Sequence, residues 1–212
     1  MRSMRKLRLI GDIHGDLHEI YSLIQTMYDY DLTIQLGDFG IGFGAEDYLL
    51  DLNPEFVRIL QGNHDNPSLI KQFPHDLGRF GVFNFYGYKI FFVAGAWSID
   101  QAKRKPGFTW WHDEELGFKE QTDCLDLWEE VCESIDLVIS HDCPNDIARW
   151  ILRKEPFGSA TGRLLQEILK IHEPPLWKFG HWHTNFKCRL GKTEFQCLDI
   201  NKQLVLNIEE KE

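Results

Sequence analysis

The sequence predicts an α/β domain, chiefly because three apolar, strand-like runs each end in a polar group. These runs cover residues 7–10, 32–36 and 56–60. A glycine stands directly after the first two runs and one residue after the third, and the next residue has a side-chain oxygen in each case: Asp12, Asp38 and Asn63. Strands of this kind, separated by a helical segment, favour a sheet whose functional residues lie beyond the carboxyl ends of its strands.

The remaining elements follow in chain order. A helix is expected from about Asp16 to Tyr28, because its apolar residues recur at helical spacing. Two β-rich runs around Gly87, between Val82 and Gly95, predict a hairpin. Later segments predict a strand, a helix, a second strand and an antiparallel closing ribbon, at residues 136–140, 160–172, 176–179 and 187–208.

The composition limits the partners of the chain. Its 212 residues, of 24.9 kDa, fit a single domain spanning residues 1–212. The formal net charge of -10 gives no general attraction to polyanions. We therefore expect no tight binding of duplex nucleic acid, whereas nucleotides and short oligonucleotides stay open as substrates.

Three features bear on location. No apolar run reaches the roughly 20 residues of a membrane helix, so no membrane association is expected. The opening MRSMRKLRLI is interpreted as a first strand and not a signal peptide, because Arg8 interrupts its short apolar part. The five cysteines form an odd set without a C-x-x-C pair, which favours a reducing compartment. The cytoplasm is the expected location.

Polar residues gather at the expected strand ends. They are Asp12, His14, Asp38, Asn63, His64, Asp65, His141, His181 and His183. In extended backbone, residues i and i+2 point to the same side, so Asp12-x-His14 and His181-x-His183 can each aim two ligands into one cavity. Isolated histidines such as His75 and His172 are interpreted as structural.

Imidazole and carboxylate ligands together favour borderline divalent ions. We expect two of them, with manganese first and iron, zinc, nickel or cobalt as alternatives. Two ions about 3.5–4 Å apart, sharing one carboxylate, would clamp the oxygens of a phosphoester. The pattern therefore predicts a dinuclear hydrolase.

Five short motifs occur between Asp12 and His183, in the order DIH, GD, GNHD, SH and GHWH. They resemble the motifs of the calcineurin-like metallophosphoesterase superfamily, in particular those of its small bacterial and phage members. The resemblance implies a four-layer α/β/β/α sandwich of two mixed sheets flanked by helices. It implies a first metal held by Asp12, His14, Asp38 and His183. Asp38 would bridge to a second metal completed by Asn63, His141 and His181.

The resemblance also implies the chemistry. A metal-bridging hydroxide would attack phosphorus, and His64 would protonate the leaving oxygen as a general acid. Asp65 would orient His64 and raise its basicity. The implied activity is that of a phosphodiesterase or phosphatase acting on nucleotide-type or other small phosphoesters.

One departure bears on the substrate. Protein serine/threonine phosphatases usually carry an arginine shortly after the second motif, where this chain reads GDFGIGFG. A protein phosphatase is therefore the weaker alternative. A catalytically inactive binding scaffold is another, although no ligand and no acid histidine is missing.

Two further segments flank the motifs. Gly37, Gly40, Gly42 and Gly44 predict a flexible loop beside the metals. Residues 96–116 concentrate cations and tryptophans, which either bind a phosphate and stack a base or simply pack the loop. Arg104 is the first candidate for a substitute phosphate clamp.

Overall fold

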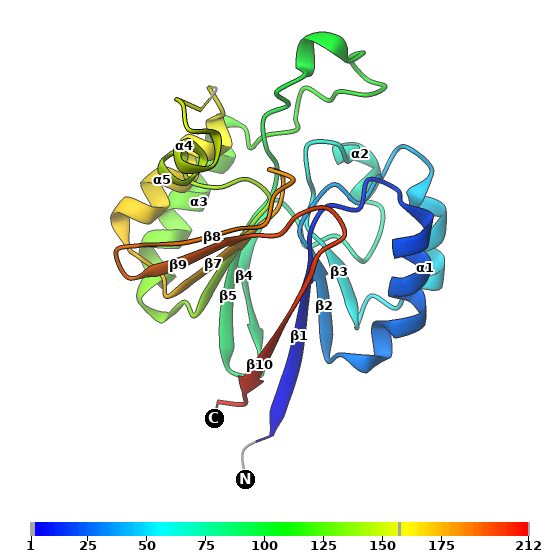
Figure 1. Cartoon of the computed structure of the whole chain (residues 1–212), viewed down its shortest axis with the longest axis horizontal. Helices are drawn as coiled ribbons and strands as arrows, with labels where there is room; N and C mark the ends of the chain where they lie inside the picture. The colour runs from blue at the N-terminus through cyan, green and yellow to red at the C-terminus, as the bar shows by residue number, and fades with distance from the viewer. Residues whose placement is uncertain (1–2, 157, 212) are drawn as a thin grey trace.

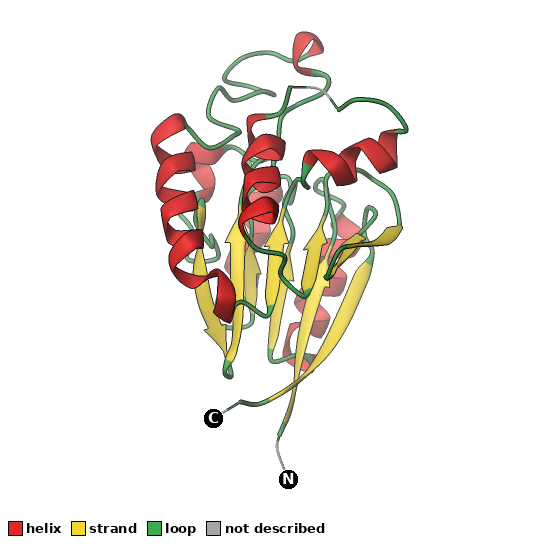
Figure 2. Cartoon of the chain, turned by 90° about the vertical axis from the view of Figure 1, so that its left-hand side faces the viewer, coloured by secondary structure: helices red, strands yellow, loops and turns green. Residues whose placement is uncertain are grey.

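The computed structural model of the chain describes residues 3–156 and 158–211. Two mixed sheets lie face to face and helices cover their outer faces, which confirms the α/β class and the four-layer arrangement (Figure 1). Helix α1 (Leu17–Thr26) packs on the outer face of the first sheet. The outer face of the second sheet is covered by α3 (Phe118–Val131), α4 (Asn145–Leu152) and α5 (Ala160–Ile171), and Figure 2 is viewed from this side.

The first sheet has four strands in the order β10-β1-β2-β3. Their bounds are β1 (Met4–Ile10), β2 (Leu32–Gln35), β3 (Val57–Ile59) and β10 (Gln203–Glu209). The first three run parallel, and β10 pairs antiparallel with β1. The carboxyl ends of β1, β2 and β3 therefore open at one rim.

The second sheet has six strands in the order β4-β5-β6-β7-β9-β8. Their bounds are β4 (Phe80–Phe85), β5 (Tyr88–Val93), β6 (Leu137–Ser140), β7 (Leu176–Phe179), β8 (Phe186–Leu190) and β9 (Thr193–Cys197). The pairs from β5 to β9 are parallel, and the edge strands β4 and β8 are antiparallel to their neighbours.

Short helices complete the chain. They are the α-helical turn α2 (Pro67–Ile70) and the 3-10 turns η1 (Met27–Asp29), η2 (Ala45–Asp51), η3 (Gln101–Lys103) and η4 (Cys132–Ser134). No helix of the two described ranges is long and apolar enough to cross a membrane.

The closing ribbon differs from expectation. Strands β8 and β9 form the expected antiparallel pair. Strand β10 instead joins the first sheet, where Leu206 lies opposite Leu7 of β1. Apolar residues of β10, including Ile208, pack into the core between the sheets, so burial of this face decides its partner.

Apolar side chains from both sheets meet in the central core. Leu9 and Ile34 of the first sheet pack with Ile90 and Ile139 of the second, and all four are fully buried. Because this shared core fixes the two sheets against each other, strand ends from both sheets supply the same rim. The loop between β5 and α3 rises above that rim (Figure 1).

Candidate dinuclear metal centre

Five strands deliver the expected residues to one rim. The turn after β1 carries Asp12 and His14, and Asp38 follows β2. The loop after β3 carries Asn63 and His64. From the second sheet, His141 follows β6, and His181 and His183 follow β7.

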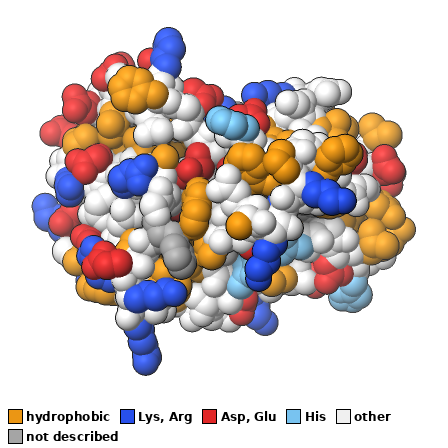
Figure 3. Space-filling view, turned by 90° about the horizontal axis from the view of Figure 1, so that it is seen from above, with side chains coloured by type: hydrophobic (Ala, Val, Ile, Leu, Met, Phe, Trp, Pro, Cys, Tyr) orange, Lys and Arg blue, Asp and Glu red, His pale blue; other side chains and the backbone are white. Residues whose placement is uncertain are grey.

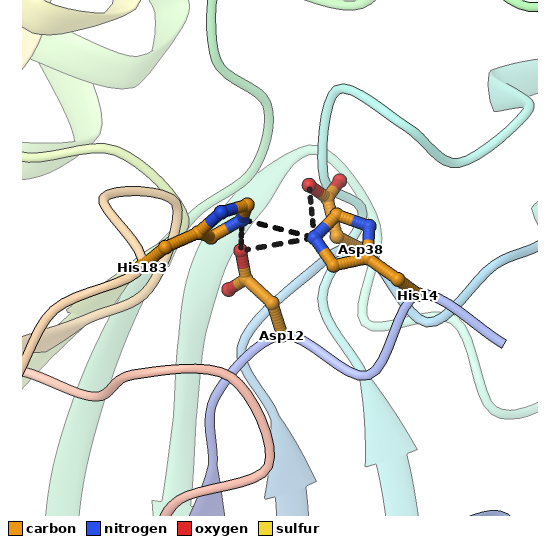
Figure 4. A group of neighbouring side chains, drawn as sticks. All are labelled: Asp12, His14, Asp38 and His183. Atoms are coloured by element: carbon orange, nitrogen blue, oxygen red, sulfur yellow. Dashed lines mark hydrogen bonds and ion pairs between the residues drawn. The ribbon is translucent and has the colours of Figure 1, made fainter. Parts of the chain in front are cut away.

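A first group of side chains comprises Asp12, His14, Asp38 and His183, whose potential ligand atoms all lie within 4.8 Å of one another (Figure 4). The Nε2 atoms of His14 and His183 are 2.9 Å apart. Asp12 Oδ2 lies 3.0 Å from His183 Nε2 and 3.6 Å from His14 Nε2. Four ligands from three separate segments thus point at one place.

A second group comprises Asp38, His141 and His181, again with ligand atoms within 4.8 Å. His141 Nε2 lies 3.4 Å from Asp38 Oδ1 and 3.1 Å from the Asn63 amide oxygen. Asp38 belongs to both groups: its Oδ2 faces His14 at 3.9 Å and its Oδ1 faces His141. A bridging role for Asp38 fits this geometry.

The two buried carboxylates suit cations. Asp12 Oδ1 accepts the His181 N–H and Asp38 Oδ1 accepts the His64 N–H, at 3.0 and 2.7 Å. The Oδ2 atoms of both are buried without a satisfactory hydrogen-bond donor. The adjacent Nε2 atoms of His14 and His183 are too close together for both to carry protons. Buried anionic oxygens and imidazole lone pairs that converge in this way fit divalent ions.

The electrostatics agree with ionised carboxylates. Burial alone would raise the pKa of Asp12, but the adjacent imidazoles of His14 and His183 outweigh it and lower that pKa to about 2. Burial likewise opposes ionisation of Asp38, yet the nearby charge of His141 holds the pKa of Asp38 well below its usual range. Both carboxylates are therefore ready to bind cations at neutral pH.

Backbone conformation also marks these residues. Four of the candidate ligands adopt left-handed backbone, with φ of 51°, 61°, 65° and 44° at His14, Asp38, His181 and His183. Such conformations cost about 1–3 kcal/mol each in a non-glycine residue and persist only where surrounding contacts impose them. The fold thus holds strained turns at the rim, as functional sites commonly do.

Glycines of the motifs make room for ligands from other segments. A Cβ atom at Gly62 would clash with the Asp38 carboxylate, and one at Gly180 would clash with that of Asp12. The glycine before Asn63 and the glycine before His181 are therefore packing requirements of the centre.

Asp65 does not have the predicted role. Its buried carboxylate accepts five backbone N–H groups at 2.9–3.3 Å. The donors are Asp38, Phe39, Gly40, Ile41 and Gly62. The expectation that Asp65 orients His64 is therefore corrected, because both its oxygens are engaged in holding the backbone that carries Asp38. Together with Glu46, which accepts from Gly42 and Gly44, it anchors the glycine-rich loop expected to be flexible.

His64 lies beside the two ligand groups and belongs to neither. Its ring packs edge-on against that of His14, with centroids 4.8 Å apart, and its Nε2 contacts the Arg104 guanidinium. Burial, opposed by Asp38 and assisted by Arg104, lowers the pKa of His64 to about 4. The ring is therefore placed at the edge of the centre with one nitrogen toward Arg104.

Arg104 reaches the centre from the loop between β5 and α3. Its Nε pairs with Asp100 at 2.6 Å, and its side chain is 8% exposed. A cavity of about 390 Å³ lies between the ligands and this loop, lined by Asp38, His64, Arg104 and the apolar Ile99. The structure thus brings the predicted clamp residue to the candidate site.

Other residues of this segment behave structurally. Trp111 is buried and packs against Phe43, with ring centroids 5.6 Å apart, so it packs the loop. As expected of structural histidines, His75 is buried against the Leu52 carbonyl and His172 packs against Trp128. On the face seen from above, basic side chains are scattered among acidic ones and form no continuous surface (Figure 3).

Known proteins resemble the chain in sequence. A lariat debranching enzyme of Drosophila pseudoobscura pseudoobscura is 24% identical, over 85% of this chain and 43% of its own length. The chain thus spans less than half the length of the curated relatives it matches.

Solved structures give the same fold. A putative 5'-nucleotidase from Staphylococcus aureus, in complex with alpha-ketoglutarate, has a TM-score of 0.62 at 14% identity, over 98% of this chain and 52% of its own. A dimetal phosphatase from Danio rerio has a TM-score of 0.58 at 14% identity, over 92% and 87%.

A family model described as calcineurin-like phosphoesterase matches residues 5–185, which include every candidate ligand. With two ligand groups that share a carboxylate and this match across most of its length, the chain belongs to the calcineurin-like phosphoesterase family.

Proposed function

We propose that the protein hydrolyses small phosphodiesters of nucleotide type, with two divalent ions, manganese first, held by Asp12, His14, Asp38, Asn63, His141, His181 and His183. The observation that carries this proposal is the position of Asp38. Its two oxygens face two separate ligand groups at the floor of a single cavity. A shared carboxylate of this kind is typical of two-metal hydrolases.

The chain's own residues would divide the work around a phosphoester in the cavity. When bound, the ions would supply charge neutralisation of the phosphate oxygens and activation of water. Arg104 would bind a further phosphate oxygen, and the anionic substrate would offset the charge that Arg104 exerts on His64. The imidazole of His64 would deliver a proton to the leaving oxygen. Ile99 would pack against the apolar part of the substrate.

The nucleotide-type substrate is supported by two comparisons. One relative is a lariat debranching enzyme, and one structural neighbour is a putative 5'-nucleotidase. The cavity of about 390 Å³ suits a small ligand better than a folded partner.

A protein phosphatase is the alternative that Arg104 favours. Arg104 supplies a cation at the cavity, although no arginine follows the second motif of the sequence. Measuring the turnover of phosphopeptides and of dinucleotides would distinguish the two activities. An inactive scaffold is the less favoured alternative, since the ligands and His64 are retained.

Metal removal tests the proposed function. The purified protein, stripped with a chelator, is expected to lose hydrolysis of bis-(p-nitrophenyl) phosphate and to regain it with Mn²⁺ up to two ions per chain. Elemental analysis and titration calorimetry measure the stoichiometry. Turnover that survives complete metal removal, or binding of no more than one ion, would contradict the proposal.

Replacing Arg104 by alanine is expected to raise KM for a dinucleotide about tenfold, because a charge-assisted hydrogen bond contributes about 1.5–3 kcal/mol. Metal content should stay at the wild-type value, since Arg104 belongs to neither ligand group. Lys105→Ala is the matched control, a cation of the same loop that is exposed. An unchanged KM in Arg104→Ala would remove Arg104 from the substrate site.

We also propose that residues 1–212 act as one metallophosphoesterase domain in the cytoplasm. The core shared between the two sheets supports the first statement. All five cysteines are free, which supports a reducing compartment.

A further inference from the structure

Two buried residues outside every motif stand behind Asn63. Ser98 follows β5 and Glu114 precedes α3, and their exposures are 0% and 3%. We propose that Ser98 and Glu114 are positioning residues that fix the Asn63 amide with its oxygen, and not its nitrogen, toward the second cation. This inference rests on the proposed metal centre and adds to it the two residues that fix the orientation of one ligand, the Asn63 amide.

The direction of each hydrogen bond follows from the donors available. Glu114 accepts the backbone N–H of Ser98 on one carboxylate oxygen at 2.8 Å, and the Ser98 hydroxyl on the other at 2.5 Å. Burial raises the pKa of Glu114, and the hydrogen bonds from Ser98 only partly oppose this rise. As a carboxylate, Glu114 can only accept hydrogen bonds. A serine hydroxyl has only one proton. Having given it to Glu114, Ser98 Oγ can only accept from Asn63, whose Nδ2 lies 3.0 Å away.

The far side of the amide faces another acceptor. His141 Nδ1 lies 2.7 Å from the Leu36 carbonyl oxygen, which can only accept, so Nδ1 carries the proton. As a ligand His141 would give up its second proton and present the lone pair of Nε2 to the cation, and the Asn63 Oδ1 atom lies 3.1 Å from that nitrogen. The nitrogen of His141 and the oxygen of Asn63 would then face the same ion.

Rotation of the amide by 180° would change this. The NH₂ group would then donate to Nε2 of a neutral His141, and the site would be satisfied without a metal. In that orientation the amide oxygen would face Ser98 Oγ, whose proton is already given to Glu114. The Ser98–Glu114 pair thus disfavours the self-satisfied orientation and keeps the oxygen ready for the ion.

An isosteric change of Glu114 would reverse the direction of the hydrogen bonds that join residue 114, Ser98 and Asn63. In Glu114→Gln, the side-chain oxygen can still accept the Ser98 N–H, while its NH₂ donates to Ser98 Oγ. The hydroxyl proton then turns to Asn63, which must present its oxygen to Ser98 and its NH₂ to the cation. We expect Mn²⁺ binding at the second site to weaken about 10–100-fold, as for other outer ligand partners, with the first site unchanged.

Calorimetry and electron paramagnetic resonance of bound Mn²⁺ count the two sites in the wild type and in each variant. Glu120→Gln, which also caps a backbone N–H but lies 41% exposed, is the control for an acid-to-amide change in this region. Ser98→Ala is the second variant, and it is expected to weaken the second site as well. Wild-type affinity in both Ser98→Ala and Glu114→Gln would overturn the inference.

The Asn63→Asp background separates orientation from general damage. A carboxylate presents oxygen on both sides, so the orientation of residue 63 no longer matters there. Adding Glu114→Gln to that background is expected to leave second-site affinity unchanged. An equal loss in both backgrounds would mean a merely structural role and overturn the inference. A wild-type chain that fails to bind a second ion would instead contradict the proposed function.

Discussion

Asp38→Asn is expected to lower kcat/KM for phosphodiesters by a thousandfold or more, which corresponds to about 4 kcal/mol of transition-state stabilisation. The physical reason is that this side chain faces both ligand groups, with Oδ2 3.9 Å from His14 and Oδ1 3.4 Å from His141. An amide removes one negative charge from between the ions. It also turns an NH₂ group, which cannot bind a cation, toward one of the two groups.

Metal content provides the independent readout for Asp38→Asn. The wild-type Tm should rise with Mn²⁺, because ions that bind only the folded chain stabilise it. The variant should show a smaller rise and fewer than two ions per chain. Asp136→Asn is the control, since Asp136 accepts from the Lys89 N–H in a pair that does not include the centre. Two tightly bound ions in Asp38→Asn would refute the bridging role.

The candidate ligands could be predicted from the sequence because their positions depend on local rules. Each lies within a few residues of a strand end, and the ends of parallel strands meet at one rim. Alternation along extended backbone explains the pairs that start at Asp12 and His181. Even so, the left-handed turns at these residues were not predictable, because they are imposed by contacts from other segments.

Roles that depend on distant partners could not be predicted. Asp65 accepts hydrogen bonds from backbone amides up to 27 residues away. From the sequence its adjacent residue, His64, was the plausible hydrogen-bond partner, but that prediction was incorrect. Ser98 and Glu114 come from a loop without hydrophobic periodicity, so no pattern singled them out. They become recognisable only as two buried polar residues joined to a ligand.

The same limit applies to strands and helices. The alternating pattern of β10 indicates a strand but not the strand with which it pairs. Strand β10 pairs with β1, and not with the ribbon of β8 and β9, because of how its apolar residues pack in the core between the sheets. Helix α3 was not predicted, because its sequence is highly charged and buries little beyond Cys124 and Trp128. Trp128 donates to the Ile168 carbonyl of α5 at 2.9 Å, so tertiary contacts fix this helix.

His64→Ala is expected to lower kcat about 10²–10⁴-fold for phosphodiesters with poor leaving groups, the range that general acid catalysis contributes. The loss should be smaller for bis-(p-nitrophenyl) phosphate, because p-nitrophenolate departs with little need of a proton. Both ions should be retained, since His64 belongs to neither ligand group. His18→Ala is the control, a histidine whose side chain is 89% exposed.

The dependence on the leaving group distinguishes His64 from the ligands. Loss of a ligand such as Asp38 weakens the stabilisation of the phosphate itself, so kcat should fall by about the same factor for every leaving group. Loss of a proton donor penalises each ester according to the basicity of its departing oxygen. A plot of log kcat against leaving-group pKa should therefore become steeper in His64→Ala, while Asp38→Asn shifts the line without changing its slope. An unchanged slope in His64→Ala, with both ions bound, would exclude His64 as the acid and leave its contact with Arg104 as its only function in the cavity.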